Sequence, residues 1–177
     1  MSTVTDLTGS EIAVALVPTT VTLVTARDAS GADKVATIAW AMPVSHTPSL
    51  IAVSIRPGGQ TAKAMAASGC FVVNVLGRGQ EGIAAVCGAK SGVDDRVGAA
   101  GLSMSDAQRV NASRVEQAVS WIECELLERR PCGDHELFIG RTLAAQTRGS
   151  LDAAGKLVPQ SPLVMGQRGC FGHFEED

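Results

Sequence analysis

One continuous stretch, residues 35–74, restricts how this chain can fold more than any other. Residues 35–42 are small and apolar without a charge, residues 43–49 contain two prolines, and residues 50–55 are mostly apolar again. Apolar runs bounded by turn-forming residues predict a strand, a loop and a second strand. Residues 62–67 are rich in alanine and predict a helix, and the apolar run after them predicts another strand. We therefore expect closely spaced strands joined by one short helix.

A glycine-containing turn lies between the second of these strands and the helix. Residues 56–61 read Arg-Pro-Gly-Gly-Gln-Thr, with a cation at the start and a hydroxyl at the end. The free amides of a first helical turn and the positive end of the helix dipole attract anions, and glycine lets a ligand approach the backbone. We therefore expect an anion site formed by Arg56 and Thr61, with help from Ser54. The alternative is an ordinary capped helix with a solvated arginine.

Most of the remaining chain also predicts strands. Strand-like patterns of β-branched or alternating apolar residues occur at residues 19–26, 115–129, 136–146 and 163–174. One helical pattern ends at Leu16, and a second covers residues 77–88. Turns are expected at residues 28–33 and 151–160, and an exposed loop at residues 89–101. A chain of 177 residues is long enough for one domain with a sizeable core, so we expect one domain over residues 1–177. Because the helices fall between strands without regular βαβ alternation, its fold class should be mainly β, an antiparallel barrel with a few helices.

Composition and charge argue against several classes of partner. With four Phe, two Trp, no Tyr and a net charge of −3, the chain lacks the stacking platforms and basic patches of a nucleic-acid-binding protein. The longest uncharged stretch, residues 35–55, is interrupted by Pro43 and Pro48, so no membrane span is expected. The N-terminal segment lacks the pattern of a signal peptide, and five cysteines without a Cys-x-x-Cys motif predict reduced thiols. We expect a cytoplasmic protein.

Two short motifs that could carry chemistry receive other interpretations. Gly77, Gly79 and Gly82 match the dinucleotide-binding fingerprint, but the residues after the helix supply no apolar run for a second parallel strand. We interpret this match as a turn. Cys132 and His135 could both bind zinc, yet a zinc site needs further ligands that the sequence does not group with them, so a turn before a strand is favoured there as well.

A series of short motifs in the chain resembles the flavin reductase-like FMN-binding split barrels. The motifs include Ala36-Thr37, Ser45-x-x-Pro48, the turn ending in Thr61, Gly69-Cys-Phe-Val-Val-Asn74, Cys87-Gly-x-x-Ser-Gly92 followed by Asp95-Arg96, Gly133-Asp-His135 before Phe138-Ile-Gly140, and Pro162-Leu163. Their order and spacing cover nearly the whole chain. The resemblance implies a split barrel that binds FMN at the interface of a homodimer. It also implies reduction of the flavin by NADH or NADPH.

Three functions are compatible with this resemblance. In the first, a flavin reductase passes electrons from reduced flavin to an acceptor or to a partner oxygenase. The first alternative is a non-enzymatic FMN-binding electron carrier that resembles flavoredoxin, and the second is a haem-binding split barrel. The absence of an obvious acid–base pair fits the first function, because hydride transfer is chemistry of the cofactor and the protein supplies position and electrostatics.

The same resemblance implies the residues of the site. The backbone of residues 37–40 would pass along the edge of the isoalloxazine ring, because small residues beside it allow a close approach. Trp40 and Met42 have an alternative role in packing of the core or of a dimer. Arg96 is a further phosphate candidate that would reach across the dimer. The expected cofactor-binding residues are Ala36, Thr37, Ile38, Ala39, Trp40, Ser45, Ser54, Ile55, Arg56, Gln60, Thr61 and Arg96.

His135 is the one candidate catalytic residue. In proteins that this chain resembles, the Gly-Asp-His segment lies near the flavin, where a histidine could donate a hydrogen bond to nicotinamide or to reduced flavin. The other interpretation is that His135 only begins the following strand. Both interpretations are open at this point.

Overall fold

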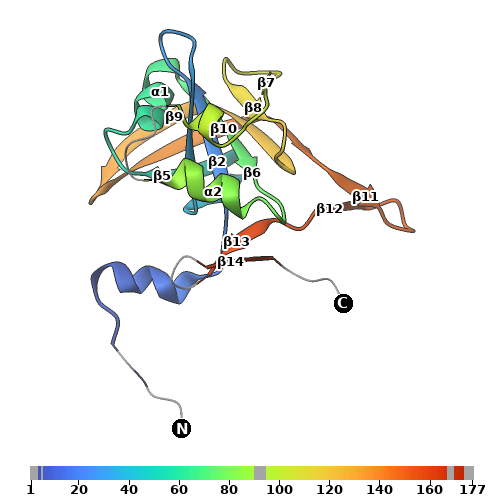
Figure 1. The fold of residues 1–177 in the computed structure, drawn as a ribbon, viewed down its shortest axis with the longest axis horizontal. Helices are drawn as coiled ribbons and strands as arrows, with labels where there is room; N and C mark the ends of the chain where they lie inside the picture. The colour runs from blue at the N-terminus through green and yellow to red at the C-terminus, as the bar shows by residue number, and fades with distance from the viewer. Residues whose placement is uncertain (1–3, 5, 90–94, 167–169, 174–177) are drawn as a thin grey trace.

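The computed structural model describes residues 4, 6–89, 95–166 and 170–173 of the chain. Figure 1 shows a body of strands on which helices α1 and α2 lie, with the hairpin of strands β11 and β12 projecting from it. The elements follow one another as 3₁₀ helix η1 (Gly9–Leu16), β1 (Thr19–Thr20), β2 (Thr22–Arg27), β3 (Asp33–Ile38), β4 (Ala41–His46), β5 (Ser49–Ile55), α1 (Gln60–Ser68), β6 (Cys70–Val75), α2 (Glu81–Gly88), α3 (Arg96–Ala99), β7 (Met104–Asp106), β8 (Ser113–Val115), β9 (Ser120–Cys132), β10 (His135–Thr147), β11 (Gly149–Leu151), β12 (Leu157–Pro159), β13 (Leu163–Met165) and β14 (Phe171–His173).

Seven strands form the main sheet in the order β3-β2-β6-β9-β10-β5-β4. Each neighbouring pair in this sheet is antiparallel, so the expected mainly antiparallel β fold is confirmed. No parallel pair occurs among the described strands, and the fingerprint that precedes α2 therefore opens no βαβ dinucleotide-binding unit. Within the described residues, no helix has the length and apolar character needed to cross a membrane.

The core under the main sheet joins α1 to the inner faces of the strands. Met65 on α1, Phe71 on β6 and Phe138 on β10 have no exposed surface and belong to one cluster of buried side chains. Gly140 makes their packing possible. A Cβ atom at Gly140 would lie 2.6 Å from Cζ of Phe71, so any other residue would displace an aromatic ring.

The prediction for residues 35–49 is partly wrong. The expected strand over residues 35–42 is two strands, because β3 ends at Ile38 and the chain turns before β4 begins at Ala41. Most of the expected loop over residues 43–49 is strand, with Pro43 inside β4. A proline is tolerated there because β4 is an edge strand of the sheet and, among the described strands, pairs only with β5, with a register shift just after the proline.

The other expected elements are present with shifted boundaries, but the short strands β7, β11 and β12 were not predicted, and β12 lies within the turn expected at residues 151–160. The predicted strand at residues 19–26 is interrupted at Val21, and the predicted helix at residues 77–88 begins only at Glu81. The expected loop at residues 89–101 contains α3, while residues 90–94 lie outside the described residues. The segment predicted as one last strand forms the two short strands β13 and β14, and Phe174 lies outside the described residues.

Candidate functional site

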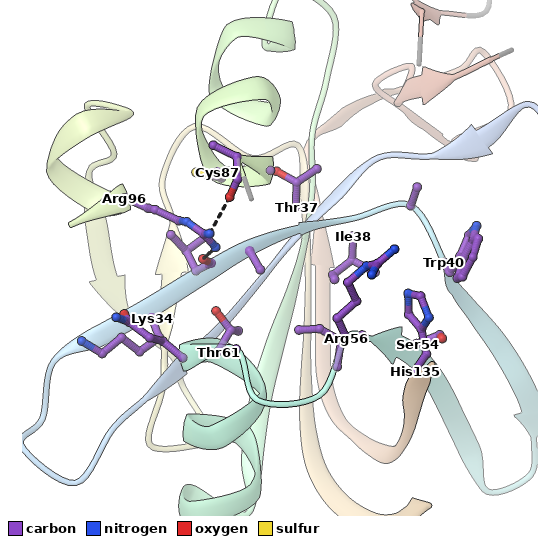
Figure 2. Close-up of a pocket in the computed structure, with 18 of the residues that line it drawn as sticks. Lys34, Thr37, Ile38, Trp40, Ser54, Arg56, Thr61, Cys87, Arg96 and His135 are labelled. Carbon is purple, nitrogen blue, oxygen red and sulfur yellow. Dashed lines mark hydrogen bonds between the residues drawn. The ribbon is translucent and has the colours of Figure 1, made fainter. Parts of the chain in front are cut away.

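A cleft of about 780 Å³ runs along β3 and is covered by the start of α1, by the end of α2 and by α3. It extends from the first residues of β3 to the turn after Ile38, where β10 begins nearby (Figure 2). A volume of this size is typical of sites for small molecules and cofactors. Twelve of the thirteen residues expected at the site line the cleft, namely Ala36, Thr37, Ile38, Ala39, Trp40, Ser54, Ile55, Arg56, Gln60, Thr61, Arg96 and His135.

Ser45 is the one expected site residue that does not line the cleft. It lies in β4 opposite Leu50, beyond the register shift that follows Pro43. The lining of the cleft along this part of the chain ends at Trp40. The reason is the turn at residues 39–40, which sends β4 to the edge of the sheet and carries Ser45 away with it.

Two cations stand at the end of the cleft where β3 begins. Arg96, the further phosphate candidate, lines the cleft of its own chain. Its guanidinium donates to the carbonyl oxygens of Val35 at 3.3 Å and of Ala89 at 2.6 Å. Its Nε is buried and has no hydrogen-bond partner among the described residues. Lys34 is held by Asp28, with Nζ and Oδ2 separated by 3.2 Å. These side chains leave donors available for an anion.

The glycine turn occupies the middle of the cleft. Gly58 has φ +81°, a conformation that other residues adopt only with strain, and Gly59 is the N-cap of α1. Thr61 lies in the first turn of the helix and is 3% exposed. The Arg56 side chain is 71% exposed, and its Nη2 is 4.0 Å from Oδ2 of Asp134. The turn therefore combines free helix amides, a hydroxyl and a cation, as the sequence predicts.

Trp40 and His135 form the other end of the cleft. Their ring centroids are 4.9 Å apart with an interplanar angle of 45° (Figure 2). Trp40 and Met42 are 48% and 58% exposed, so the alternative that places them in the core of the chain is wrong. Nδ1 of His135 is 2.7 Å from Oδ1 of Asp134. This hydrogen bond, followed by the charges of His135 and Arg56, lowers the pKa of the Asp134 carboxyl.

The wall formed by α2 is close-packed against β3. The hydroxyl of Thr37 donates to the carbonyl oxygen of Ala84 at 2.7 Å, and a Cβ atom at Gly88 would lie 3.4 Å from Cβ of Thr37. Cys87 is fully buried in this wall. Burial raises the pKa of its thiol to about 11, against the opposing effect of Arg96. The thiol is therefore neutral near pH 7 and is a wall of the cleft rather than a nucleophile.

Sequence reasoning missed Lys34 and Cys87, which also line the cleft. Lys34 had a signal in the sequence, because it directly precedes the predicted apolar strand and a side chain there can lie at the strand's end. Cys87 had no comparable signal beyond its place in a motif. Among the described residues, no group of three or more His, Cys, Asp or Glu side chains could hold a metal ion.

Comparisons with known proteins agree with this fold and cleft. The model of the flavin reductase-like domain matches residues 14–172. The NADH-dependent FMN reductase AsuE2 of Streptomyces nodosus subsp. asukaensis is 34% identical over 157 residues, which cover 86% of this chain and 77% of that protein. An uncharacterised protein of Aeropyrum pernix is 32% identical over 111 residues, and the match spans only 42% of its length.

Solved structures show the same architecture. An FMN-binding protein from Thermus thermophilus, solved with bound 1-cyclohex-2-enone, has a TM-score of 0.80 and 25% identity, with 98% of this chain and 94% of that chain covered. BorF, the flavin reductase component of a bacterial two-component tryptophan halogenase, has a TM-score of 0.75 and 25% identity, with 91% and 93% covered. Because the family model covers most of the sequence, the chain belongs to the family of flavin reductase-like domains, whose solved neighbours are FMN-binding split barrels.

Proposed function

We propose that this protein is an FMN-dependent oxidoreductase that transfers a hydride from NADH or NADPH to flavin. The observation that carries the proposal is a single cleft that combines a glycine turn at a helix start, cations and an aromatic end. Such a cleft has a place for a phosphate and a place for a flat ring. The relatives named as an NADH-dependent FMN reductase and as a flavin reductase component support the same chemistry, with NADH as the first donor to test.

The residues of the cleft fit FMN in three respects. The turn that begins at Arg56 and ends at Thr61 offers amides and a hydroxyl to the phosphate. The buried Nε of Arg96, which lacks a partner among the described residues, would gain an acceptor from a bound anion. The small residues Ala36 in β3 and Ala39 in the turn after it would let the edge of the isoalloxazine ring approach the backbone of residues 36–39.

The bound flavin would supply the hydride acceptor, and the chain would supply position and electrostatics. The backbone at residues 36–40 and the turn before α1 would fix the ring and the phosphate at separate points. Fixing both ends of the flavin would present one face of the ring to nicotinamide at a constant distance. His135 would hold a hydrogen-bonding nitrogen at the aromatic end, where nicotinamide would stack.

A homodimer and an oxygenase partner belong to the same proposal. Trp40, Met42 and Val44 are large apolar residues on or beside edge strand β4, and they are 48%, 58% and 45% exposed. An exposed apolar edge next to a binding cleft is suited to an interface between two copies of the chain. The halogenase component BorF supports transfer of reduced flavin to a separate oxygen-using enzyme. FMN is the flavin that AsuE2 and the Thermus protein name.

The second candidate function is a flavin carrier without reductase activity, and the FMN-binding protein of Thermus thermophilus motivates it. An absorbance spectrum of purified protein loaded with FMN separates the two functions. Under anaerobic conditions, we expect NADH to bleach the flavin band faster than it bleaches free FMN. Flavin bands that persist with both NADH and NADPH would favour the carrier, and a Soret band in the purified protein would favour a haem-binding protein.

A further inference from the structure

Asp134 does not line the cleft, yet it makes the only short polar contact of the His135 side chain within the described part of the protein. Asp134 lies in the two-residue turn between β9 and β10, in which Gly133 has φ +61°, and His135 begins β10 opposite Cys132. A two-residue loop leaves the backbone little freedom. The turn therefore holds the carboxylate and the imidazole beside each other whether or not a ligand is present.

The hydrogen bond defines which imidazole nitrogen carries the proton. The pKa of the Asp134 carboxyl is lowered, so this group is ionised near pH 7 and can only accept hydrogen bonds. Nδ1 of His135 must therefore donate to Oδ1 of Asp134 across the 2.7 Å separation. In a neutral ring Nε2 is then unprotonated and keeps a lone pair. The side chain of His135 is 14% exposed, so this second nitrogen is largely shielded from water.

Two further contacts hold this arrangement in place. Arg56 approaches the other carboxylate oxygen of Asp134 at 4.0 Å, so the carboxylate lies between the guanidinium and the imidazole. The ring of Trp40 packs against the imidazole, with the two ring centroids 4.9 Å apart, and limits the rotation of the imidazole. Two other titratable groups lie near His135, and neither has a polar contact with its ring among the described residues. Cys132 is exposed on the opposite strand, and Glu136 is bonded to Arg129 at 2.7 Å. Asp134 is therefore the group that orients the ring.

We infer that Asp134 is a positioning residue that fixes the tautomer and the direction of His135. Nε2 then faces the cleft, where it accepts a hydrogen bond in the neutral ring and donates one in the protonated ring. The inference rests on the proposed function for its effect on catalysis, but the tautomer itself is a property of the protein alone. A carboxylate that sets the tautomer of a histidine usually raises the activity of the other ring nitrogen many-fold.

The tautomer can be measured directly from the ¹⁵N chemical shifts of the His135 ring in flavin-free protein. In the wild type we expect Nδ1 to be protonated and Nε2 unprotonated. In Asp134→Ala we expect the proton to move largely to Nε2. Glu125→Gln is the matched control, because Glu125 also lies on the β9–β10 hairpin and is paired with Arg141 at 2.5 Å, outside the cleft. The control should leave the His135 signals unchanged.

Kinetics supply the second test. Asp134→Ala should lower the rate of flavin reduction about three- to tenfold with FMN affinity unchanged, and it should have no further effect in a His135→Ala background. A wild-type ring with the proton on Nε2, or an equal effect of Asp134→Ala with and without His135, would overturn the inference. Failure of NADH to reduce the flavin would instead reject the proposed function, and the ¹⁵N measurement would still decide the tautomer.

Discussion

At the end of the cleft where β3 begins, the charged side chains are bonded to the chain itself, whereas the cation nearer to Trp40 and His135, Arg56, is largely open to solvent. Arg96 donates to two backbone carbonyls, and Lys34 is paired with Asp28. Hydrogen bonds from Ser30 and then from Lys34 hold the pKa of the Asp28 carboxyl well below its usual range. In the glycine turn, between that end and the end with Trp40, the Arg56 side chain is 71% exposed and has one distant partner among the described residues.

This difference indicates that the two ends of the cleft bind different parts of the reaction complex. Side chains that are already ordered lose little entropy when a ligand binds, so the end with Arg96 is suited to a ligand that stays bound. The exposed Arg56 must be ordered by each ligand, and the end with the half-exposed Trp40 is suited to a molecule that enters and leaves. We expect the flavin to be retained by the ordered part of the cleft and the nicotinamide to exchange at the aromatic end.

The largest expected difference between the two ends concerns their cysteines. Cys87 is buried beside Arg96, while Cys132 is exposed opposite His135. Burial raises the pKa of the Cys87 thiol from its ordinary value of 9.0 to about 11. Near pH 8, Cys87 therefore carries roughly a hundredfold less thiolate than a thiol with the ordinary pKa. We therefore expect a thiol reagent at pH 8 to modify Cys132 more than a hundred times faster than Cys87, as measured by mass spectrometry of digested protein.

The pH dependence of this contrast follows from the sign of the shift. Because the pKa of Cys87 is higher in the folded chain than in the unfolded chain, the stabilisation by a neutral buried thiol is complete below about pH 9. It is lost as the pH rises towards 11, and modification of Cys87 should accelerate there. Cys132→Ser is the control that removes the exposed thiol at this end of the cleft, and exposed Cys170 is followed as a separate peptide. Equal rates for both cysteines at pH 8 would show that the end with Arg96 is as open as the other.

The two ends also differ in how far the sequence predicts them. The glycine turn was predictable, because Arg56, the glycines and Thr61 are consecutive and the chemistry of a helix start is local. The bonds of Arg96 were not predictable, since its partner Val35 is 61 positions away and the contact depends on how α3 packs on β3. Ser45 lies outside the cleft for a related reason. Its position depends on the edge placement of β4, which no local pattern records.

The site of the FMN phosphate gives the next test, with a smaller effect. Thr61 is buried at the turn, so Thr61→Val keeps its volume and removes one hydroxyl donor. A hydrogen bond to a charged group contributes about 1.5–3 kcal/mol, so FMN affinity should fall about ten- to a hundredfold. Arg56→Ala should have a smaller effect because its side chain is mostly solvated. Fluorescence titration with FMN and with riboflavin, which has no phosphate, measures the difference.

The same titration tests where along the cleft the phosphate lies. Arg141→Ala is the matched control, because Arg141 is paired with Glu125 outside the cleft. It should leave both affinities unchanged. If the phosphate lay at the beginning of β3, Lys34→Ala would selectively weaken FMN and Thr61→Val would not. Equal weakening of FMN and riboflavin by Thr61→Val would place the phosphate away from the turn.

The smallest effect is expected for His135 at the open end of the cleft. Its imidazole is fixed by Asp134 and Trp40 and lines the cleft, so it can make one hydrogen bond to nicotinamide or to reduced flavin. Losing one such bond costs about 1 kcal/mol, and His135→Ala should slow flavin reduction by NADH about five- to tenfold in stopped-flow measurements. FMN affinity should stay nearly unchanged, because the proposed phosphate and ring contacts lie elsewhere. His46→Ala, on exposed β4, is the control. A variant without His135 that reduces flavin at the wild-type rate would mean that this residue only begins β10, and the open end would then owe its role to Trp40 alone.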